Sequence, residues 1–268
     1  MMGLELGGSQ GVGSLPGGKK AGMSGESVRG KTALITGAGR RVGRATALAL
    51  AREGANIIVH YGRSEEEARQ VCREIEQHSV KAWGLQADLE KPEEYETLIK
   101  RVLELAGSIE ILVNNASIFP PSELGDVSFD DVVANLQVNA WAPFVLTREF
   151  ARQVGKGRIV NLIDSRIQGY DFAHVAYILS KHLLALLTRM TALEFAPDIT
   201  VNGVAPGLIL PPPGEDESYL ERLKGTVPLK CHGEPEDIAE AVVFLVKSNF
   251  ITGQIIYVDG GRHLKEST

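Results

Sequence analysis

A tyrosine and a lysine four residues apart, Tyr177 and Lys181, are the strongest candidates for chemistry in this sequence. They fall in a stretch that reads as helical, residues 174–196, so the two side chains share one helix face. A phenol that exchanges protons near neutral pH needs its pKa of about 10 lowered, and a nearby ammonium favours the phenolate. The spacing predicts an acid/base pair, although neighbours on a solvent-exposed helix face show the same pattern.

Two further polar residues belong with this pair. Asp164 follows an apolar strand and precedes Tyr177 by thirteen residues. Asn139 falls inside a long predicted helix, where we expect its side chain to distort the helix and to hold a water that relays protons to Lys181. The alternative is that the Asn139 side chain only caps a helix or faces solvent. We expect Asp164, Tyr177, Lys181 and Asn139 to form the catalytic group.

A glycine-rich segment, Thr36 to Gly43, follows the first predicted strand and opens an alanine-rich helix. Glycines at such a place allow a tight turn and let a pyrophosphate approach the N–H groups of the helix N-terminus. An ordinary strand-to-helix turn would also use glycines. The position at the first strand of a βαβ unit nevertheless favours a dinucleotide site.

The end of the second predicted strand indicates which dinucleotide is bound. An NAD site normally places an Asp or Glu there to accept from the ribose 2′-hydroxyl. This chain has Arg63 and Ser64 instead, with Arg40 in the glycine-rich loop. A guanidinium can grip a 2′-phosphate with two hydrogen bonds. NADP(H) is therefore the predicted cofactor, the alternative being a solvated Arg63 and a Ser64 that only caps a helix.

The third and fourth predicted strands also end in polar residues. Asp88 follows the third strand, where its carboxylate is placed to accept from the adenine amino group or to cap a helix. The run from Asn114 to Ser117 follows the fourth strand, where small polar side chains and bare backbone can border the cofactor ribose.

These residues need a sheet to position them, and the chain predicts one from Gly30 onward. The expected strands are residues 33–36, 56–60, 82–87, 109–114, 158–163, 200–204 and 254–258. The expected helices are residues 41–53, 64–77, 92–106, 129–153, 174–196 and 235–247. Such alternation implies right-handed crossovers. We expect one Rossmann-like, doubly wound α/β domain over residues 30–268, with about seven parallel strands and helices on both faces. Residues 1–29 are expected to form a disordered glycine-rich tail.

Composition excludes several classes of function. The net charge of −6 argues against a nucleic-acid partner, which usually meets a basic surface. No apolar run approaches the roughly 20 residues of a membrane span. Cys72 and Cys231 lie far apart, as expected of two reduced thiols in a cytoplasmic protein. His60, His174 and His182 do not cluster with other ligands, so they are predicted to be structural and no metal site is expected.

Together the motifs resemble the short-chain dehydrogenase/reductase family, in the family's order from about residue 31 to residue 264. They are Thr36-Gly-x-x-x-x-x-Gly43, Asn114-Asn-Ala, Asn139, Tyr177-x-x-x-Lys181, Asn202-x-x-x-Pro206-Gly and Asp259-Gly-Gly. The resemblance implies that Tyr177 is the acid/base, Lys181 its partner and ribose anchor, and Asn139 the relay residue. It also implies a homotetramer packed through residues 92–106, 129–153 and 174–196.

Two departures from the common family pattern are informative. Arg41 stands where most members carry glycine, and Asp164 where most carry serine. Both are similar to the pteridine reductase branch. In that branch the serine that matches Ser117 lies beside the cofactor and pterin, and the phenylalanine that matches Phe119 stacks on the pterin ring. The ending Asp-Gly-Gly-Arg262-His-Leu is similar to dihydromonapterin reductases of the same branch.

The expected activity is therefore NADPH-dependent reduction of a dihydropterin, and of dihydrofolate as a further substrate, to the tetrahydro form. Reducing a C=N bond needs a proton at nitrogen besides the hydride at carbon, and Asp164 can share that supply with Tyr177. The segment from Leu208 to Gly225 is the expected substrate lid. Open alternatives are a reductase of a 3-oxoacyl thioester or sugar alcohol, a non-catalytic NADP(H) sensor, and a packing role for Phe119.

The predicted sites can be stated residue by residue. The expected cofactor site comprises Gly37, Arg40, Arg41, Val42, His60, Tyr61, Arg63, Ser64, Asp88, Leu89, Asn115, Ala116, Ser117, Lys181, Pro206 and Gly207. The expected substrate site comprises Arg41, Ser117, Phe119, Asp164, Tyr177 and Leu208.

Overall fold

The computed structural model describes residues 25–212 and 214–265, and these form one seven-stranded sheet in the order β3-β2-β1-β4-β5-β6-β7. Each neighbouring pair runs parallel. The strands are β1 (Thr32–Ile35), β2 (Asn56–Tyr61), β3 (Ala82–Gln86), β4 (Ile111–Asn114), β5 (Gly157–Leu162), β6 (Ile199–Pro206) and β7 (Ile255–Val258). The predicted doubly wound parallel sheet is confirmed.

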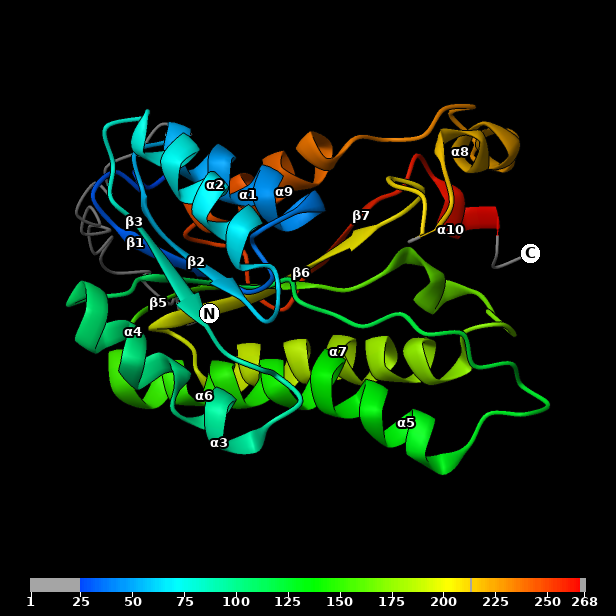
Figure 1. Ribbon diagram of the computed structural model, residues 1–268, viewed down its shortest axis with the longest axis horizontal. Coiled ribbons are helices and arrows are strands. Elements are labelled where there is room, and N and C mark those ends of the chain that lie inside the picture. Colours follow the sequence, from blue (N-terminus) through cyan, green and yellow to red (C-terminus); the bar gives the residue numbers. More distant parts are fainter. Residues whose placement is uncertain (1–24, 213, 266–268) are drawn as a thin grey trace, which may run out of the picture.

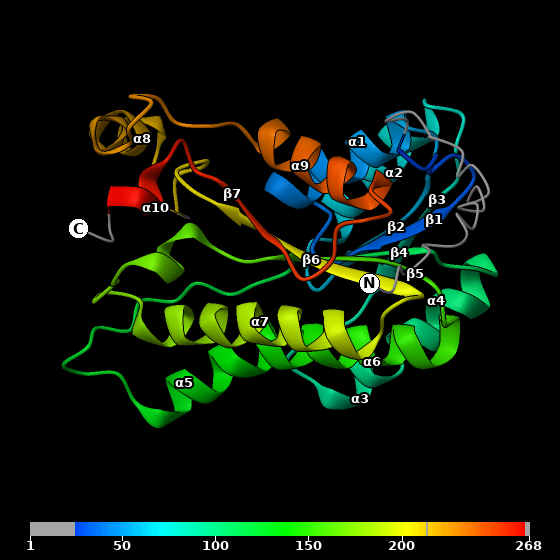
Figure 2. The same ribbon diagram turned by 180° about the vertical axis from the view of Figure 1, so that it is seen from behind.

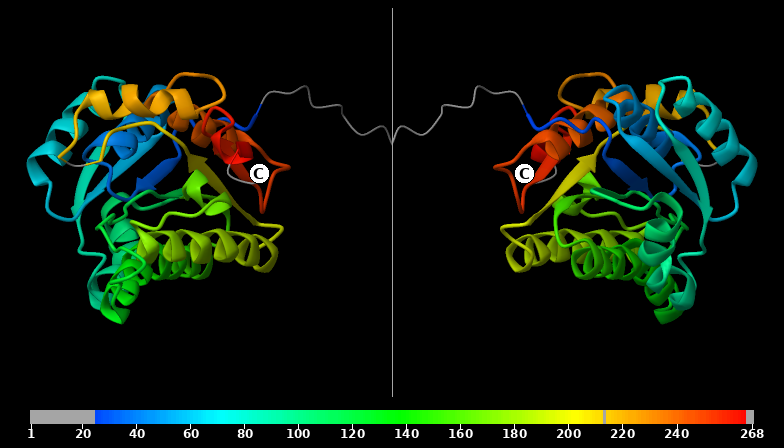
Figure 3. Two further views of the ribbon diagram at one scale, coloured as in Figure 1. Left: turned by 90° about the vertical axis from the view of Figure 1, so that its right-hand side faces the viewer. Right: turned by 90° about the vertical axis from the view of Figure 1, so that its left-hand side faces the viewer.

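Helices cover both faces of this sheet (Figures 1 and 2). One layer contains α1 (Arg41–Arg52), α2 (Glu65–Glu76) and α9 (Pro235–Lys247). The opposite layer contains α3 (Pro92–Glu96), α4 (Leu98–Ala106), α5 (Phe129–Leu136), α6 (Ala142–Val154) and α7 (Val175–Glu194). The short helices α8 (Glu217–Leu223) and α10 (Arg262–Lys265) lie together at one end of the molecule. The end-on views in Figure 3 show the three layers in section.

The strands are buried on both sides, as their continuous Val/Ile/Leu composition requires. Successive strand residues point into two hydrophobic cores, one on each face of the sheet. Ala33 and Ile35 pack toward α1, α2 and α9, whereas Leu34 packs toward α4 and α6. Phe150 of α6 is a large, fully buried side chain of the second core. Burial on both faces fixes the register of the sheet and hence the places at which its strands end.

Two predicted long helices are interrupted. The stretch 92–106 breaks at Thr97, whose hydroxyl donates to the carbonyls of Glu93 and Glu94 and so competes with the backbone ladder. The stretch 129–153 contains a π-helical turn, Gln137–Trp141. Pro143 follows it, and because proline has no N–H it cannot donate to the carbonyl four residues back.

The domain begins earlier than the predicted boundary at Gly30. Val28 is buried, Glu26 forms an ion pair with Arg158 of β5, and the Glu26 N–H donates to Lys247 of α9. Residues 25–29 therefore pack against the sheet, and including them in the expected disordered tail was wrong. The rest of that predicted tail, residues 1–24, lies outside the described residues. Within the described ranges, no helix has the length and apolarity needed to cross a membrane.

Candidate active site

The carboxyl ends of the strands surround a large cavity of about 1320 Å3. Ligands of doubly wound sheets bind at this edge, where the strand order reverses beside β1. All residues predicted for the cofactor and substrate sites line the cavity, with Tyr61 as the exception. Adjacent strand residues point to opposite faces, and Tyr61 packs against the core beneath α1 and α2. The prediction for the Tyr61 side chain is therefore wrong.

The glycine-rich loop after β1 forms the floor of the cavity. Gly37 has a φ of +65°, and a Cβ on Gly43 would lie 2.3 Å from the carbonyl oxygen of Gly37. The turn thus requires glycine and leaves room for a bulky group above the start of α1. The Thr36 hydroxyl accepts from the N–H groups of Asn115 and Ala116 at 2.9 and 3.0 Å, which ties the end of β1 to the end of β4.

His60 supports this loop from below. It is 1% exposed, its Nδ1 accepts from the Gly37 N–H at 3.1 Å, and its Nε2 lies 3.1 Å from the Ala87 carbonyl. The neutral ring with its proton on Nε2 satisfies both contacts. Burial lowers the pKa of His60 to about 4, against the opposing effect of the Ala87 hydrogen bond. His60 therefore positions the cofactor loop as a neutral residue.

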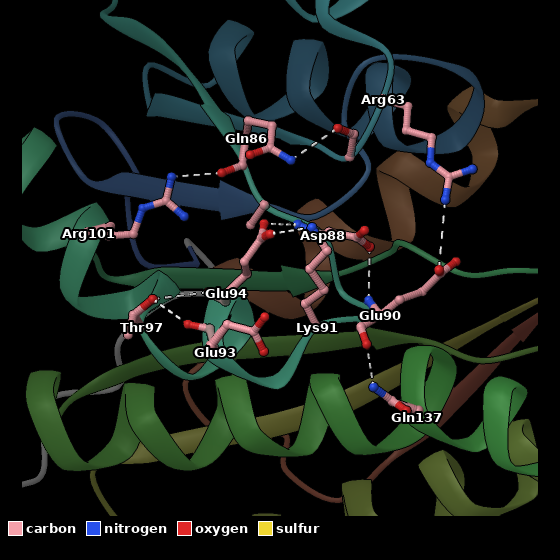
Figure 4. Close-up of polar contacts among 12 residues, drawn as sticks. Arg63, Gln86, Asp88, Glu90, Lys91, Glu93, Glu94, Thr97, Arg101 and Gln137 are labelled. Atoms are coloured by element: carbon pink, nitrogen blue, oxygen red, sulfur yellow. Dashed lines mark hydrogen bonds and ion pairs between the residues drawn. The ribbon is translucent and has the colours of Figure 1, made fainter.

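The residues predicted to bind the 2′-phosphate line the cavity, and Figure 4 shows one of them, Arg63, directed toward Glu90. Arg63 is 86% exposed, and its guanidinium lies 3.8 Å from the Glu90 carboxylate. Ser64 precedes α2 but makes no side-chain cap, so its hydroxyl is not occupied by the helix. The Asp88 carboxylate accepts from the Glu90 N–H at 3.0 Å and so closes a local turn, whereas the N-cap position of α3 is occupied by Lys91. Exposed Arg63 and uncommitted Ser64 fit a 2′-phosphate.

The proposed catalytic pair lies at the centre of the cavity wall. The Tyr177 hydroxyl donates to Asp164 Oδ2 at 2.8 Å, and Lys181 Nζ donates to the Leu162 carbonyl at 2.8 Å. Tyr177 and Lys181 are 7% and 2% exposed. The structure thus brings Asp164, Tyr177 and Lys181 together, as the sequence predicts.

The pKa of Tyr177 is raised, whereas the sequence predicted that the nearby ammonium of Lys181 would lower it. Burial and the charge of Asp164 raise this pKa well above its ordinary value, and the opposing charge of Arg166 does not cancel them. Burial also lowers the pKa of Lys181 to about 8. Tyr177 is therefore a protonated donor, held by a carboxylate.

Asn139 lies behind the cavity wall and is fully buried. It sits in the π-helical turn, which confirms the expected distortion of the helix. Its side chain accepts from the Ile118 N–H at 2.8 Å and donates to the Ile118 carbonyl and the Ser180 hydroxyl at 3.0 Å each. Asn139 thus fixes the strand-end loop that carries Ser117 and Phe119.

Phe119 forms the aromatic part of the substrate region. His174 stacks on its ring with a centroid distance of 3.9 Å, Tyr177 meets it edge-on at 4.6 Å, and the Arg166 guanidinium lies 4.8 Å from its centroid. His174 also contacts Asp171 at 3.1 Å. His174 is therefore part of the cavity wall beside the reacting groups.

The expected lid lies across the cavity from this cluster. Arg41 has the left-handed φ of +56°, a conformation that favours glycine, and its Nη2 donates to the Pro211 carbonyl at 2.8 Å. Leu208 packs with Leu220 and Val227 in a small cluster of its own. Arg41 thus joins the cofactor loop to the lid segment; Pro213 of that segment lies outside the described residues.

Sequence reasoning placed the segment between β5 and α7 at the ligand edge of the sheet but named no site residue in it between Asp164 and Tyr177. Arg166, Tyr170, Asp171 and Phe172 all line the cavity. The segment has no strand or helix periodicity that points to a site. The one available signal is position, because a parallel strand that ends in Asp164 must be followed by residues at the same edge.

The match to known proteins agrees with this geometry. Residues 37–263 match the family model described as enoyl-(acyl carrier protein) reductase. The chain belongs to the short-chain dehydrogenase/reductase family. It is 36% identical over 243 residues to the 3-oxoacyl-(acyl-carrier-protein) reductase FabG of Staphylococcus epidermidis, covering 87% of this chain and 99% of that protein.

Two solved structures share the whole fold. The promiscuous reductase LugOII, which catalyses a keto-reduction in lugdunomycin biosynthesis, has a TM-score of 0.83 and 33% identity, with 89% of this chain and all of that chain covered. FolM alternative dihydrofolate reductase 1 from Brucella canis, in complex with NADP, has a TM-score of 0.84 and 32% identity, with 89% and 96% covered. The NADP in the latter agrees with the cofactor predicted here.

His60 predicts a pH dependence of stability. Its folded-state pKa of about 4 lies below the ordinary 6.5, so between these values the unfolded chain binds a proton that the folded chain does not. The free energy of unfolding should fall by up to about 3 kcal/mol as the pH drops from 6.5 to 4. Urea melts of the wild type and His60→Gln across this range measure the effect.

The exposed His78 supplies the control, because His78→Gln should keep the wild-type pH slope. An equal slope in wild type and His60→Gln would contradict a neutral, buried His60.

Proposed function

We propose that this protein is an NADPH-dependent reductase of pterins, which takes a dihydropterin, and dihydrofolate as a further substrate, to the tetrahydro form. The observation that carries the proposal is Asp164 at the end of β5, with its carboxylate accepting from the Tyr177 hydroxyl at 2.8 Å. In most members of the family a serine at this position donates to the carbonyl of the substrate. An ionised carboxylate cannot make that donation.

The chemistry of a C=N bond suits this arrangement better than that of a ketone. A hydride reaches carbon, supplied by the nicotinamide when NADPH is bound, and a proton must reach the neighbouring ring nitrogen. Tyr177 is protonated, and Asp164 holds its hydroxyl in place. These two groups therefore form a proton source that a flat nitrogen heterocycle can approach from the cavity.

The chain's own residues supply the rest of the binding site. Arg63, Ser64 and Arg40 would hold the 2′-phosphate, and the turn from Gly37 to Gly43 would hold the pyrophosphate. Lys181 would anchor the nicotinamide ribose.

Three residues are assigned to the pterin itself. Phe119 would stack on the ring, a contact worth about 0.5–1.5 kcal/mol beyond burial. Ser117 would lie beside cofactor and pterin, and Arg41 would meet the polar edge of the ring. One face of Phe119 is already in contact with His174. The Arg166 guanidinium also lies over this ring, 4.8 Å from its centroid. The pterin therefore has to displace His174 or Arg166 to stack on Phe119.

The second candidate is reduction of a 3-oxoacyl thioester. The observation in its favour is the 36% identity to a 3-oxoacyl-(acyl-carrier-protein) reductase over nearly that protein's whole length. Against it stands Asp164, which replaces the carbonyl donor. NADPH oxidation with dihydrobiopterin, dihydromonapterin, dihydrofolate and acetoacetyl thioester, each assayed alone, separates the two candidates. Turnover confined to pterins supports the proposal, and turnover of the thioester alone contradicts it.

The role of Asp164 can be tested directly. Asp164→Ser should lower kcat/KM for a dihydropterin by about 100-fold or more, because a shorter, neutral hydroxyl replaces the carboxylate that holds the proton source at Tyr177. The dissociation constant of NADPH, measured by fluorescence, should change little, since Asp164 is assigned no cofactor contact. Unchanged pterin turnover in this variant would remove the basis of the substrate proposal.

Cofactor preference depends on Arg63. Arg63→Ala should weaken NADPH binding by about 10- to 100-fold and leave NADH nearly unaffected, because only NADPH carries the 2′-phosphate. Arg73→Ala, an exposed arginine of α2, is the matched control. Equal weakening of NADPH and NADH by Arg63→Ala would argue against the phosphate grip.

We also propose a homotetramer, and we expect the protein in the cytoplasm. Four exposed apolar residues of α7, namely Leu179, Leu186, Met190 and Leu193, recur at helical spacing on one face. Exposed apolar patches of this kind mark protein interfaces. Light scattering should give a tetramer for the wild type and a smaller species for Leu186→Lys/Leu193→Lys. A monomeric wild type would contradict this proposal.

A further inference from the structure

The segment after β5 places a second charged residue beside the Tyr177–Asp164 pair. Arg166 lies in the short 3-10 helix Ser165–Gln168 and lines the cavity. Its Nε is 3.4 Å from Asp164 Oδ1, and its Nη1 donates to Asp171 Oδ2 at 2.6 Å. Its guanidinium carbon lies 4.8 Å from the centroid of Phe119. Arg166 thus contacts a proposed proton-handling residue and the proposed stacking residue together.

These contacts hold the guanidinium as a fixed cation. Burial disfavours the charge, but the carboxylates of Asp164 and Asp171 outweigh burial and keep the pKa of Arg166 above its ordinary value. Asp171 in turn is held by its neighbours, because Oδ1 accepts from the N–H groups of Ala173 and His174. The loop backbone therefore orients Asp171, and Asp171 orients Arg166.

One nitrogen of this group remains available. Nε faces Asp164 and Nη1 is bonded to Asp171, whereas across the described residues Nη2 takes part in no hydrogen bond or ion pair. The side chain keeps 28% of its surface exposed in the wall of the cavity. A half-buried site thus presents a preorganised donor next to Asp164.

We propose that Arg166 binds the substrate, donating through Nη2 to an acceptor atom on the edge of the heterocycle beside the nitrogen that is protonated. This inference rests on the proposed pterin activity. In a pterin each nitrogen of the reducible ring has an acceptor at the adjacent position of the fused pyrimidine ring, a carbonyl oxygen beside one and a ring nitrogen beside the other. The closeness of Arg166 to the Asp164–Tyr177 pair matches that pattern. A simple ketone offers no such second acceptor.

Arg166→Met tests the assignment, because it keeps much of the side-chain volume and removes every donor. KM for a dihydropterin should rise by about 10- to 100-fold, and the dissociation constant of NADPH should stay within about 2-fold. Arg166→Lys retains the charge but not the planar fork, so it should restore only part of the loss. Arg73→Met is the matched control and should behave as wild type.

A second variant leaves Arg166 in place. Asp171→Asn retains an oxygen for the N–H groups of Ala173 and His174 but replaces the acceptor of Arg166 with an amide nitrogen. It should raise KM less than Arg166→Met does, because the guanidinium keeps its donors and loses its orientation. Thermal unfolding of each variant separates these effects from loss of fold.

The outcomes distinguish this inference from the proposed function. Wild-type pterin turnover with an unchanged KM in folded Arg166→Met would overturn the role of Arg166 alone. No pterin turnover by the wild type would overturn the proposed function and the role of Arg166 with it. A raised KM in Arg166→Met with unchanged NADPH affinity supports both.

Discussion

The hydrogen bond between the Tyr177 hydroxyl and the Asp164 carboxylate is the interaction on which the rest of the site depends. Asp164 is only 13% exposed, and a carboxylate in such a place must be paired. Its acceptors are used by Tyr177 on one side and by the backbone N–H of Arg166 on the other. Leaving a buried polar group without its hydrogen-bond partner typically costs about 1–3 kcal/mol, and more when the group is charged. The conformation of the segment after β5 therefore depends on the hydrogen bonds that this carboxylate accepts.

Much of the fold could be predicted because strands buried on both faces give continuous apolar runs in the sequence. All strands of a parallel sheet also end at the same edge, so the residues that follow them lie together. Asp164, Tyr177 and Lys181 could be predicted on the same grounds. Arg166 and His174 could not, since their contacts with Phe119 and Asp171 join residues far apart in the chain. Tyr61 was assigned wrongly because strand alternation turns it away from the cavity. The interruptions at Thr97 and Asn139 come from single side chains and from Pro143.

Overall sequence similarity and the chemistry of the site point to different substrates. The match to a 3-oxoacyl-(acyl-carrier-protein) reductase extends over 87% of this chain at 36% identity, so it reflects a shared domain. The residues that touch the reacting group are few. In the proposed site Asp164 replaces the usual carbonyl donor, and Arg41 and Phe119 are the residues assigned to the pterin. Because binding a substrate depends on these contacts more than on the scaffold, we give them the greater weight.

A competition assay tests the central claim most directly. Purified protein, limiting NADPH, and equal concentrations of a dihydropterin and acetoacetyl thioester are combined in one reaction, and both products are quantified. The ratio of products then gives the ratio of the two kcat/KM values. A site built around the Tyr177–Asp164 pair predicts that tetrahydropterin is the dominant product. Preferential formation of the hydroxyacyl thioester would contradict the account.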